Sequence, residues 1–173
     1  MPASIPRYLA EIAQRLPEKT AIISPSRSIT FGELYNESMA TAECLREMGL
    51  NTGDRVGICM EKTVDQAIAI LGVLCANAAV VPILPRLKGP NIRHIMENSG
   101  MAAMITDADR LQEVSDFADI TRLITGHGEI SNDWPNLPYL RRFIKPRNFF
   151  DRIGNDNAAI IYSSGSTGRP KGI

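Results

Sequence analysis

The sequence has no surplus of either charge and few aromatic residues. Its 173 residues contain 19 Lys and Arg against 19 Asp and Glu, so the formal net charge is zero, and aromatic side chains make up 6%. A chain without a basic surplus has little to offer a nucleic acid or an anionic membrane. We therefore expect no nucleic acid among its partners and no basic face for membranes.

Long apolar runs and paired cysteine motifs are also missing. The longest apolar stretch, about 67–81, is interrupted by Gly72 and Asn77 and is followed by Pro82, so no membrane span is predicted. The N-terminus has no basic region followed by an apolar core, which argues against a secretory signal. The 3 cysteines are widely spaced and form no C-x-x-C pair, so we expect reduced, mostly buried thiols. Together these features favour a cytoplasmic location, and no metal-binding cluster is predicted.

The sequence does contain a regular alternation of strand-like and helix-like segments. Strands are predicted at about 56–60, 80–84, 102–106, 121–125 and 158–162. The segments between most of them have apolar residues at helical spacing. Strand alternating with helix is typical of right-handed parallel crossover units. The predicted fold class is therefore α/β, a parallel sheet with helices on both faces.

A smaller unit is predicted ahead of that sheet. Residues 4–16 have the apolar spacing of an amphipathic helix, and residues 20–31 have the pattern of a β-hairpin with a central turn. Thr30 and Glu33 have the spacing of a capping box, which predicts a helix that runs to about Met48. We expect the hairpin to lie apart from the parallel sheet, because it interrupts the crossover pattern.

Two further side chains are predicted to begin helices. Thr63 and Gln66 have the spacing of a second capping box, and Asp107 is predicted to cap a helix that ends at about Phe117. Both positions follow a predicted strand, as a crossover helix requires.

The segment 126–156 lacks any clear period. It carries three Pro residues, the only Trp, and a basic run at 141–147. We interpret it as an irregular surface connection. A basic patch for coenzyme A or a carrier protein is the alternative, although the acidic residues nearby dilute its charge.

The most informative stretch is the last one, where an apolar strand enters a run of glycines and hydroxyl side chains and then Pro170-Lys171-Gly172. Glycines expose backbone N–H groups to an anion, hydroxyls donate to phosphate oxygens, and Lys171 supplies a positive charge. A plain turn or linker has a similar composition. The predicted phosphate-binding residues are Ser163, Ser164, Gly165, Ser166, Thr167, Gly168, Lys171 and Gly172.

Two common nucleotide motifs are absent. Pro170 stands where a Walker A loop has its second Gly, and Ile173 follows Gly172, so a P-loop ATPase is disfavoured. No G-x-G-x-x-G follows any predicted strand, which disfavours a dinucleotide-binding domain. A non-catalytic α/β nucleotide-binding module remains an alternative.

Residues 162–173, with the sequence YSSGSTGRPKGI, resemble the signature loop of the AMP-forming adenylating enzymes. That superfamily includes acyl-CoA synthetases, adenylation domains of peptide synthetases, and luciferases. Its loop contacts the β- and γ-phosphates of ATP and is mobile before substrate binds. Residues 29–34 and 74–83 are similar to two further family motifs. The resemblance implies that residues 1–173 form the N-terminal portion of the AMP-binding domain, without the small C-terminal domain.

The resemblance also implies a two-step reaction. A carboxylic acid attacks ATP to give an acyl-adenylate and pyrophosphate, and the thiol of CoA or of a carrier protein then displaces AMP. Lys171 and Thr167 would be the catalytic candidates, and ATP and Mg²⁺ the cofactors, with no residue here assigned to the metal. Residues 82–87 are similar to the sequence that acyl-CoA ligases have in this region of the family. This similarity favours an acid–CoA ligase over a peptide-synthetase adenylation domain.

The residues with which the family binds adenine, ribose, the acid and the thiol would follow position 173. We therefore expect the 173-residue chain alone to be inactive. The sequence leaves open the identity of the carboxylic acid, the choice between CoA and a carrier protein, and the oligomeric state.

Overall fold

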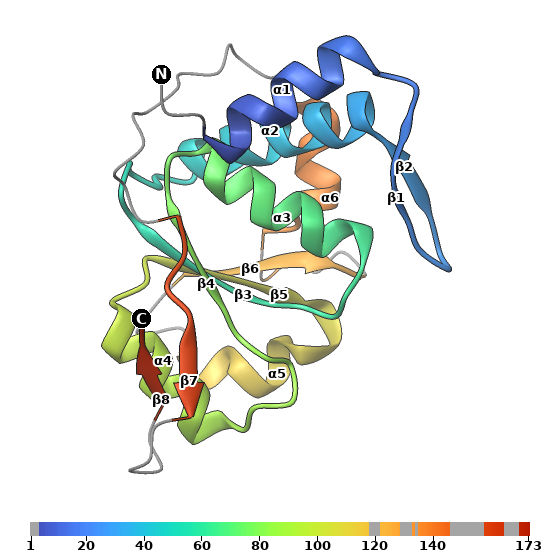
Figure 1. Ribbon diagram of the computed structural model, residues 1–173. Coiled ribbons are helices and arrows are strands. Elements are labelled where there is room, and N and C mark those ends of the chain that lie inside the picture. Colours follow the sequence, from blue (N-terminus) through green and yellow to red (C-terminus); the bar gives the residue numbers. More distant parts are fainter. Residues whose placement is uncertain (1–3, 118–121, 129–132, 134, 146–157, 165–169) are drawn as a thin grey trace.

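A parallel sheet forms the centre of the molecule (Figure 1). The computed structural model describes residues 4–117, 122–128, 133, 135–145, 158–164 and 170–173. Its central strands are β3 (Arg55–Cys59), β4 (Ala79–Pro82), β5 (Ala103–Asp107) and β6 (Arg122–His127). Within the described residues they lie in the order β4-β3-β5-β6, and every neighbouring pair is parallel. The predicted parallel sheet is confirmed.

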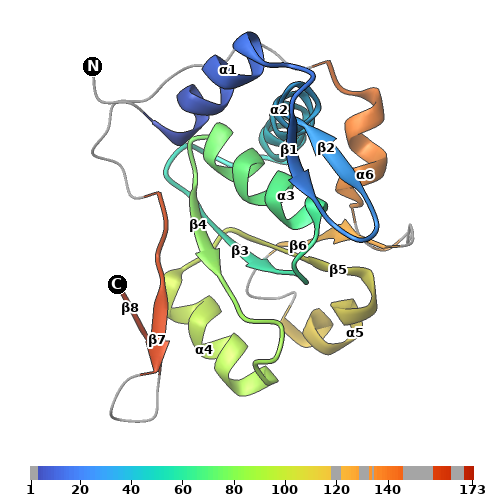
Figure 2. The same cartoon turned by 45° about the vertical axis from the view of Figure 1, so that its right-hand side comes forward.

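Helices cover both faces of this sheet (Figures 1 and 2). The helices α2 (Phe31–Glu47) and α3 (Val64–Cys75) lie over one face, with α1 (Ile5–Arg15) outside them. The helices α4 (Gly89–Ser99) and α5 (Leu111–Val114) lie over the other face. This arrangement confirms the predicted α/β class.

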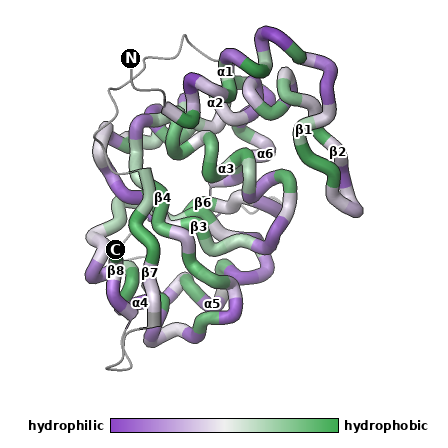
Figure 3. The backbone as a smooth tube through the Cα atoms, in the orientation of Figure 1, coloured by the Kyte–Doolittle hydropathy of each residue, from purple (hydrophilic) through white to green (hydrophobic). Residues whose placement is uncertain are grey.

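Successive strand residues supply the two apolar layers in turn. Ile105 packs in the cluster under α2 and α3, whereas its neighbour Met104 packs in the cluster under α4 and α5. Val80 and Val81 divide in the same way. Side chains alternate across a strand, so a strand covered on both faces is apolar throughout. Figure 3 shows hydrophobic colouring along much of β3 and β4.

The N-terminal hairpin is a separate sheet. The strands β1 (Thr20–Ile23) and β2 (Ser28–Thr30) pair antiparallel and project from the α/β body. Thr30 then caps α2 through a complete capping box with Glu33, as predicted. The hairpin is anchored by Ile29, which is buried in a cluster with Leu9 and Leu34.

The other two predicted caps differ from expectation. Thr63 Oγ1 accepts from the Gln66 backbone N–H, but the Gln66 side chain donates to the Met60 carbonyl, so only half of the capping box forms. Asp107 makes no cap contact, because its carboxylate accepts from the Glu61 N–H across the sheet. In place of the predicted helix to Phe117 the structure has three short elements, η1 (Ala108–Arg110), α5 and η2 (Ser115–Phe117).

Among the described residues, the fifth predicted strand, 158–162, joins the sheet through one bridge. Ala159 lies parallel to Val80, and two backbone hydrogen bonds flank that pair. The next bond of the ladder would need an N–H from Pro82, which proline lacks. The chain therefore leaves the sheet, and β7 (Tyr162–Ser164) pairs antiparallel with β8 (Pro170–Gly172) instead.

Candidate functional site

The hairpin β7–β8 carries the described part of the predicted phosphate loop. Ser163 pairs with Lys171 in its register, and Ser164 pairs with Pro170. Residues directly opposite in an antiparallel pair share one face, so the Ser163 hydroxyl and the Lys171 ammonium start from the same side of the hairpin. Both residues are exposed. The structure thus brings together two predicted site residues that are eight positions apart.

The rest of the predicted site lies outside the described residues. This applies to Gly165, Ser166, Thr167 and Gly168, and to the predicted mobility of the loop. The base of the hairpin is closed by two backbone hydrogen bonds between Ile161 and Ile173, with lengths of 3.0 and 2.9 Å.

The structure also explains why position 172 of the predicted site is a glycine. A Cβ atom at this position would lie 3.1 Å from Ile160 Cγ2 and 3.1 Å from Tyr162 Cζ. Those distances are shorter than ordinary van der Waals contacts, so glycine lets β8 approach β7 closely.

The hairpin lies beyond the carboxyl end of β4. Ala159 is aligned with Val80 in parallel, so β7 continues in the direction of β4 and passes its last residue, Pro82. Figure 1 shows β7 and β8 beside α4 at this end of the sheet. Ligands of open α/β sheets bind outside the carboxyl ends of the strands, which is where this hairpin lies.

Two side chains of α4 contact the hairpin, one for each strand. The Tyr162 hydroxyl of β7 donates to Asn98 Oδ1 at 2.6 Å, and His94 Nε2 lies 3.0 Å from the Pro170 carbonyl oxygen of β8. Burial raises the pKa of the Tyr162 phenol, so this hydroxyl stays protonated and able to donate at neutral pH. Sequence reasoning missed both contacts, because they join residues 64 and 76 positions apart.

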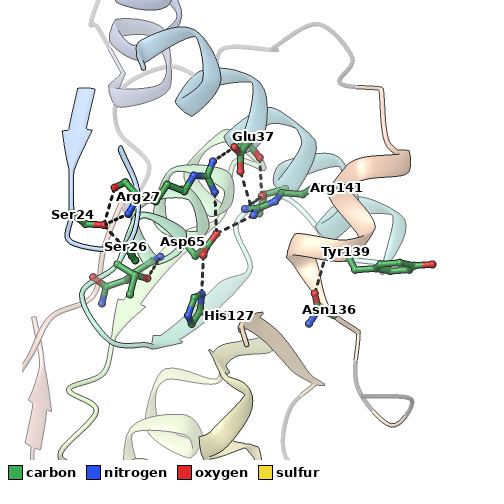
Figure 4. A network of polar contacts seen from close by, with 12 residues as sticks. Ser24, Ser26, Arg27, Glu37, Asp65, His127, Asn136, Tyr139 and Arg141 are labelled. Carbon is green, nitrogen blue, oxygen red and sulfur yellow. Dashed lines mark hydrogen bonds and ion pairs between the residues drawn. The ribbon is translucent and has the colours of Figure 1, made fainter. Parts of the chain in front are cut away.

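A second polar cluster joins the N-terminal hairpin to the α/β body (Figure 4). It contains Arg27, Glu37 of α2, Asp65 of α3, His127 of β6, and Arg141 of η3 (Arg141–Phe143). Each carboxylate here has cationic or imidazole partners, so the cluster is a satisfied structural network.

This network also corrects the interpretation of segment 126–156. Its described part includes α6 (Leu137–Leu140) and η3, so it is not irregular throughout. The Arg141 side chain is only 8% exposed and contacts Asp65 and Glu37, whereas Arg142 is exposed. The first cation of the basic run therefore serves the fold and is not available to an anionic partner.

One groove opens between α2 and the segment after α6. It has a volume of about 390 Å³, and its polar lining includes Glu43, Glu47 and Lys145 beside the apolar Met48 and Leu140. Two carboxylates against one ammonium make this groove a poor place for a triphosphate.

The cysteines are excluded as nucleophiles. All three are free and buried, as predicted. Burial raises the pKa of Cys44 to about 11 and the pKa of Cys75 to about 12, so both thiols are protonated at neutral pH. Burial also raises the pKa of Cys59. The thiolate is the reactive form, and these sites suppress it.

The described residues supply neither a metal cluster nor a membrane span. No group of three or more His, Cys, Asp or Glu side chains among them could hold a metal ion. Across the same residues, no helix has the length and apolar character needed to cross a bilayer.

Comparison with known protein families gives a match over almost the whole chain. The family described as AMP-binding enzyme matches residues 9–173. Syringomycin synthase SyrB1 from Pseudomonas syringae pv. syringae is 31% identical over 173 residues, which cover 99% of this chain and 26% of that protein. Bacitracin synthase 1 from Bacillus licheniformis is 32% identical over 172 residues, which cover 98% of this chain and 3% of that protein.

Two solved structures with the same fold are CoA ligases. A benzoate CoA ligase from Burkholderia xenovorans LB400 superposes with a TM-score of 0.85 and 25% identity, over 99% of this chain and 34% of the ligase. The anthranilate CoA ligase AuaEII, in complex with anthranoyl-AMP, gives a TM-score of 0.91 at 22% identity, over 100% of this chain and 35% of the ligase. This chain therefore spans about a third of the length of these ligases.

Proposed function

We propose, since this chain belongs to the family of AMP-binding enzymes, that the protein carrying it activates a carboxylic acid with ATP. The products of this step would be an acyl-adenylate and pyrophosphate, and a thiol would then displace AMP. In this proposal residues 1–173 are the N-terminal portion of the adenylation domain.

The pairing of Ser163 with Lys171 is the observation that carries the proposal. The pair has a hydroxyl donor and a positive charge on one face of a hairpin at the carboxyl end of the sheet. When a carboxylate attacks the α-phosphorus, negative charge grows on the departing pyrophosphate. Preorganised donors and cations that meet this charge lower the barrier. Lys171 would supply the charge in this step, and Ser163 a hydrogen bond.

The remaining loop residues complete the proposed phosphate site. Thr167 is the second catalytic candidate, and the other proposed phosphate contacts come from Ser164, Gly165, Ser166, Gly168 and Gly172. Mg²⁺ is proposed to arrive with the triphosphate, because the described residues offer it no cluster of their own. Bound to ATP, the ion would neutralise phosphate charge.

The acceptor thiol divides the proposal into two versions. We favour CoA, because residues 82–87 are similar to the acyl-CoA ligase motif and the solved structures cited above are CoA ligases. A carrier-protein thiol is the second candidate. The support for it is that syringomycin synthase SyrB1 and bacitracin synthase 1 are 31% and 32% identical to this chain. Adenylate formation is common to both versions.

Acid-dependent ATP–pyrophosphate exchange tests the shared step. We expect exchange in the protein that carries this chain, and a drop of about 10²–10³-fold in its rate for Lys171→Ala, the size seen when one transition-state donor is removed. Lys19→Ala is the matched control, because Lys19 is exposed and lies in the N-terminal part of the chain. An unchanged rate for Lys171→Ala would remove Lys171 from the site.

Two further assays separate the proposed versions. Release of AMP in the presence of CoA identifies the ligase version, and acylation of a carrier protein identifies the other. The isolated 173-residue chain is expected to show no exchange, because the groups proposed for adenine, ribose and acid would lie outside it.

A further inference from the structure

We infer that His94 and Asn98 of α4 are positioning residues for the phosphate hairpin, each fixing one of its two strands. This inference rests on the proposed function, because it concerns the same hairpin. It adds two residues that neither the loop motif nor its chemistry points to.

The two residues are one helical turn apart. Positions i and i+4 of a helix lie on the same face, so His94 and Asn98 present side chains toward the same neighbour. That neighbour is the hairpin. Asn98 accepts from the Tyr162 hydroxyl on β7 at 2.6 Å, and His94 Nε2 lies 3.0 Å from the Pro170 carbonyl oxygen on β8.

The chemistry of both contacts is defined. A carbonyl oxygen only accepts, so His94 must carry its proton on Nε2 to make this bond. The Tyr162 phenol is the donor to the Asn98 amide oxygen. Its ring also packs against the apolar cluster that contains Ile92, Ile95 and Met96, so the ring and the hydroxyl hold β7 to α4 together.

Each contact lies next to a proposed phosphate-binding residue. Tyr162 precedes Ser163, and Pro170 precedes Lys171. In the part of the chain that the structure describes, the sheet holds this segment by the bridge between Ala159 and Val80 and its two flanking hydrogen bonds. Loss of either α4 contact should therefore let the Ser163–Lys171 pair shift relative to the sheet.

Such a shift is expected to affect the rate more than the fold. Misplacement of a reacting group by 1 Å can reduce a rate by about 100-fold, so we expect about 10- to 100-fold lower exchange for Asn98→Ala and for His94→Leu. The conservative variants Asn98→Asp and His94→Gln keep an acceptor and a donor at these positions. We expect them to recover most of the rate.

The experiment uses the protein that carries this chain and two readouts. The first is kcat for ATP–pyrophosphate exchange together with the melting temperature. The second is hydrogen exchange at the Ile161 and Ile173 amides, which bond to each other across the base of the hairpin. Asn91→Ala is the matched control for Asn98→Ala, because Asn91 is an exposed residue of the same helix. The double variant Tyr162→Phe/Asn98→Ala should have a kcat no lower than that of the less active of the two single variants, because both changes remove the same hydrogen bond.

The outcomes are distinct. Faster amide exchange with lower kcat at an unchanged melting temperature, and recovery in the conservative variants, supports the inference. Unchanged amide exchange in Asn98→Ala and His94→Leu overturns it, and so does faster exchange with an unchanged kcat. If the unmodified protein forms no adenylate, the proposed function is wrong and the positioning role is wrong with it, whereas amide exchange still reports whether α4 anchors the hairpin.

Discussion

Arg141 of η3 and Asp65 of α3 form an ion pair with 3.1 Å between Nη2 and Oδ1, although the two residues are 76 positions apart. The same guanidinium nitrogen lies 3.3 Å from Glu37 Oε2 on α2. The Arg141 side chain is 8% exposed, so its charge is largely removed from water. One cation thus joins two helices to the segment that follows β6.

Removal of this cation should destabilise the fold. In Arg141→Ala, Asp65 would still pair with His127, and Glu37 would still pair with Arg27. The two carboxylates would therefore not be left without partners. Breaking a buried pair costs about 3–5 kcal/mol and an exposed pair at most about 1 kcal/mol. We expect a loss of about 2 kcal/mol in the free energy of unfolding, between these limits. Urea denaturation of the purified chain measures it.

The neighbouring residue supplies the control for this prediction. Arg142 is exposed, and its replacement by alanine should change the stability by about 0.5 kcal/mol or less. Equal losses for Arg141→Ala and Arg142→Ala would show that the network does not stabilise the fold.

The same pair shows a limit of sequence reasoning. The basic run at 141–147 gives Arg141 and Arg142 the same local character. Only the packing of η3 against α2 and α3 turns one inward and leaves the other exposed. Local signals were sufficient for the capping box of Thr30 and Glu33, although the equally local box of Thr63 and Gln66 formed only by half.

Gly72 on α3 is predicted to be irreplaceable by alanine. A Cβ atom there would lie 2.5 Å from Thr41 Cγ2 and 2.6 Å from Thr41 Cβ on α2. Helix propensity alone predicts that Gly72→Ala gains about 1 kcal/mol, whereas overpacking costs about 1–3 kcal/mol. The clash involves the Cβ atom of Thr41, which is bonded to the α2 backbone and cannot rotate away. We therefore expect a net loss of stability, measured by thermal unfolding.

The reverse substitution on the same helix calibrates the propensity term. Ala67 is partly exposed on α3, and Ala67→Gly should cost about 1 kcal/mol. A gain in stability for Gly72→Ala would show that α2 and α3 can separate at little cost.

The three buried thiols should be unreactive in the folded chain. Burial raises the pKa of Cys44 to about 11 and that of Cys75 to about 12, so few thiolates exist at pH 8. An unfolded thiol titrates near its ordinary pKa of 9.0, so the folded chain holds these protons to higher pH. Stability should therefore fall as the pH rises from about 9 toward 11. Titration with a thiol reagent at pH 8, with and without urea, counts the reactive groups.

A thiol that reacts at pH 8 without urea would contradict this prediction. Replacement of all three cysteines by alanine gives the matched reference, because the fall in stability above pH 9 should become smaller in that variant.

Long-range pairings account for two further differences between sequence and structure. The apolar run before the loop predicted a full strand at 158–162, but Pro82 on the neighbouring strand stops the ladder after Ala159. Asp107 looked like a helix cap because of its position after a strand. Its actual partner, the Glu61 N–H, is 46 residues away and could not be identified from local sequence.

Asp107 is also expected to make stability depend on pH. Its Oδ2 accepts from the Glu61 N–H at 2.7 Å, and its Oδ1 is buried without a partner among the described residues. Burial raises the pKa of this carboxyl above its ordinary value of 3.8, with the Glu61 hydrogen bond opposing the shift. The folded chain then binds the proton more tightly than the unfolded chain does, so stability falls as the pH rises above about 4 through the raised pKa.

Asp107→Asn tests this pH dependence, because the amide oxygen can still accept from the Glu61 N–H while the charge is removed. The informative quantity is the change in unfolding free energy between pH 4 and pH 7, measured by urea denaturation. The loss of unfolding free energy between pH 4 and pH 7 should be smaller in Asp107→Asn than in the unmodified chain. This comparison holds even if the new amide N–H group lowers the stability of the variant at both pH values. Asp116→Asn is the control, because Asp116 is exposed and is not among the charges that shift the pKa of Asp107, so it should leave the profile unchanged. Identical profiles for Asp107→Asn and the unmodified chain would mean that Asp107 titrates alike in the folded and unfolded states.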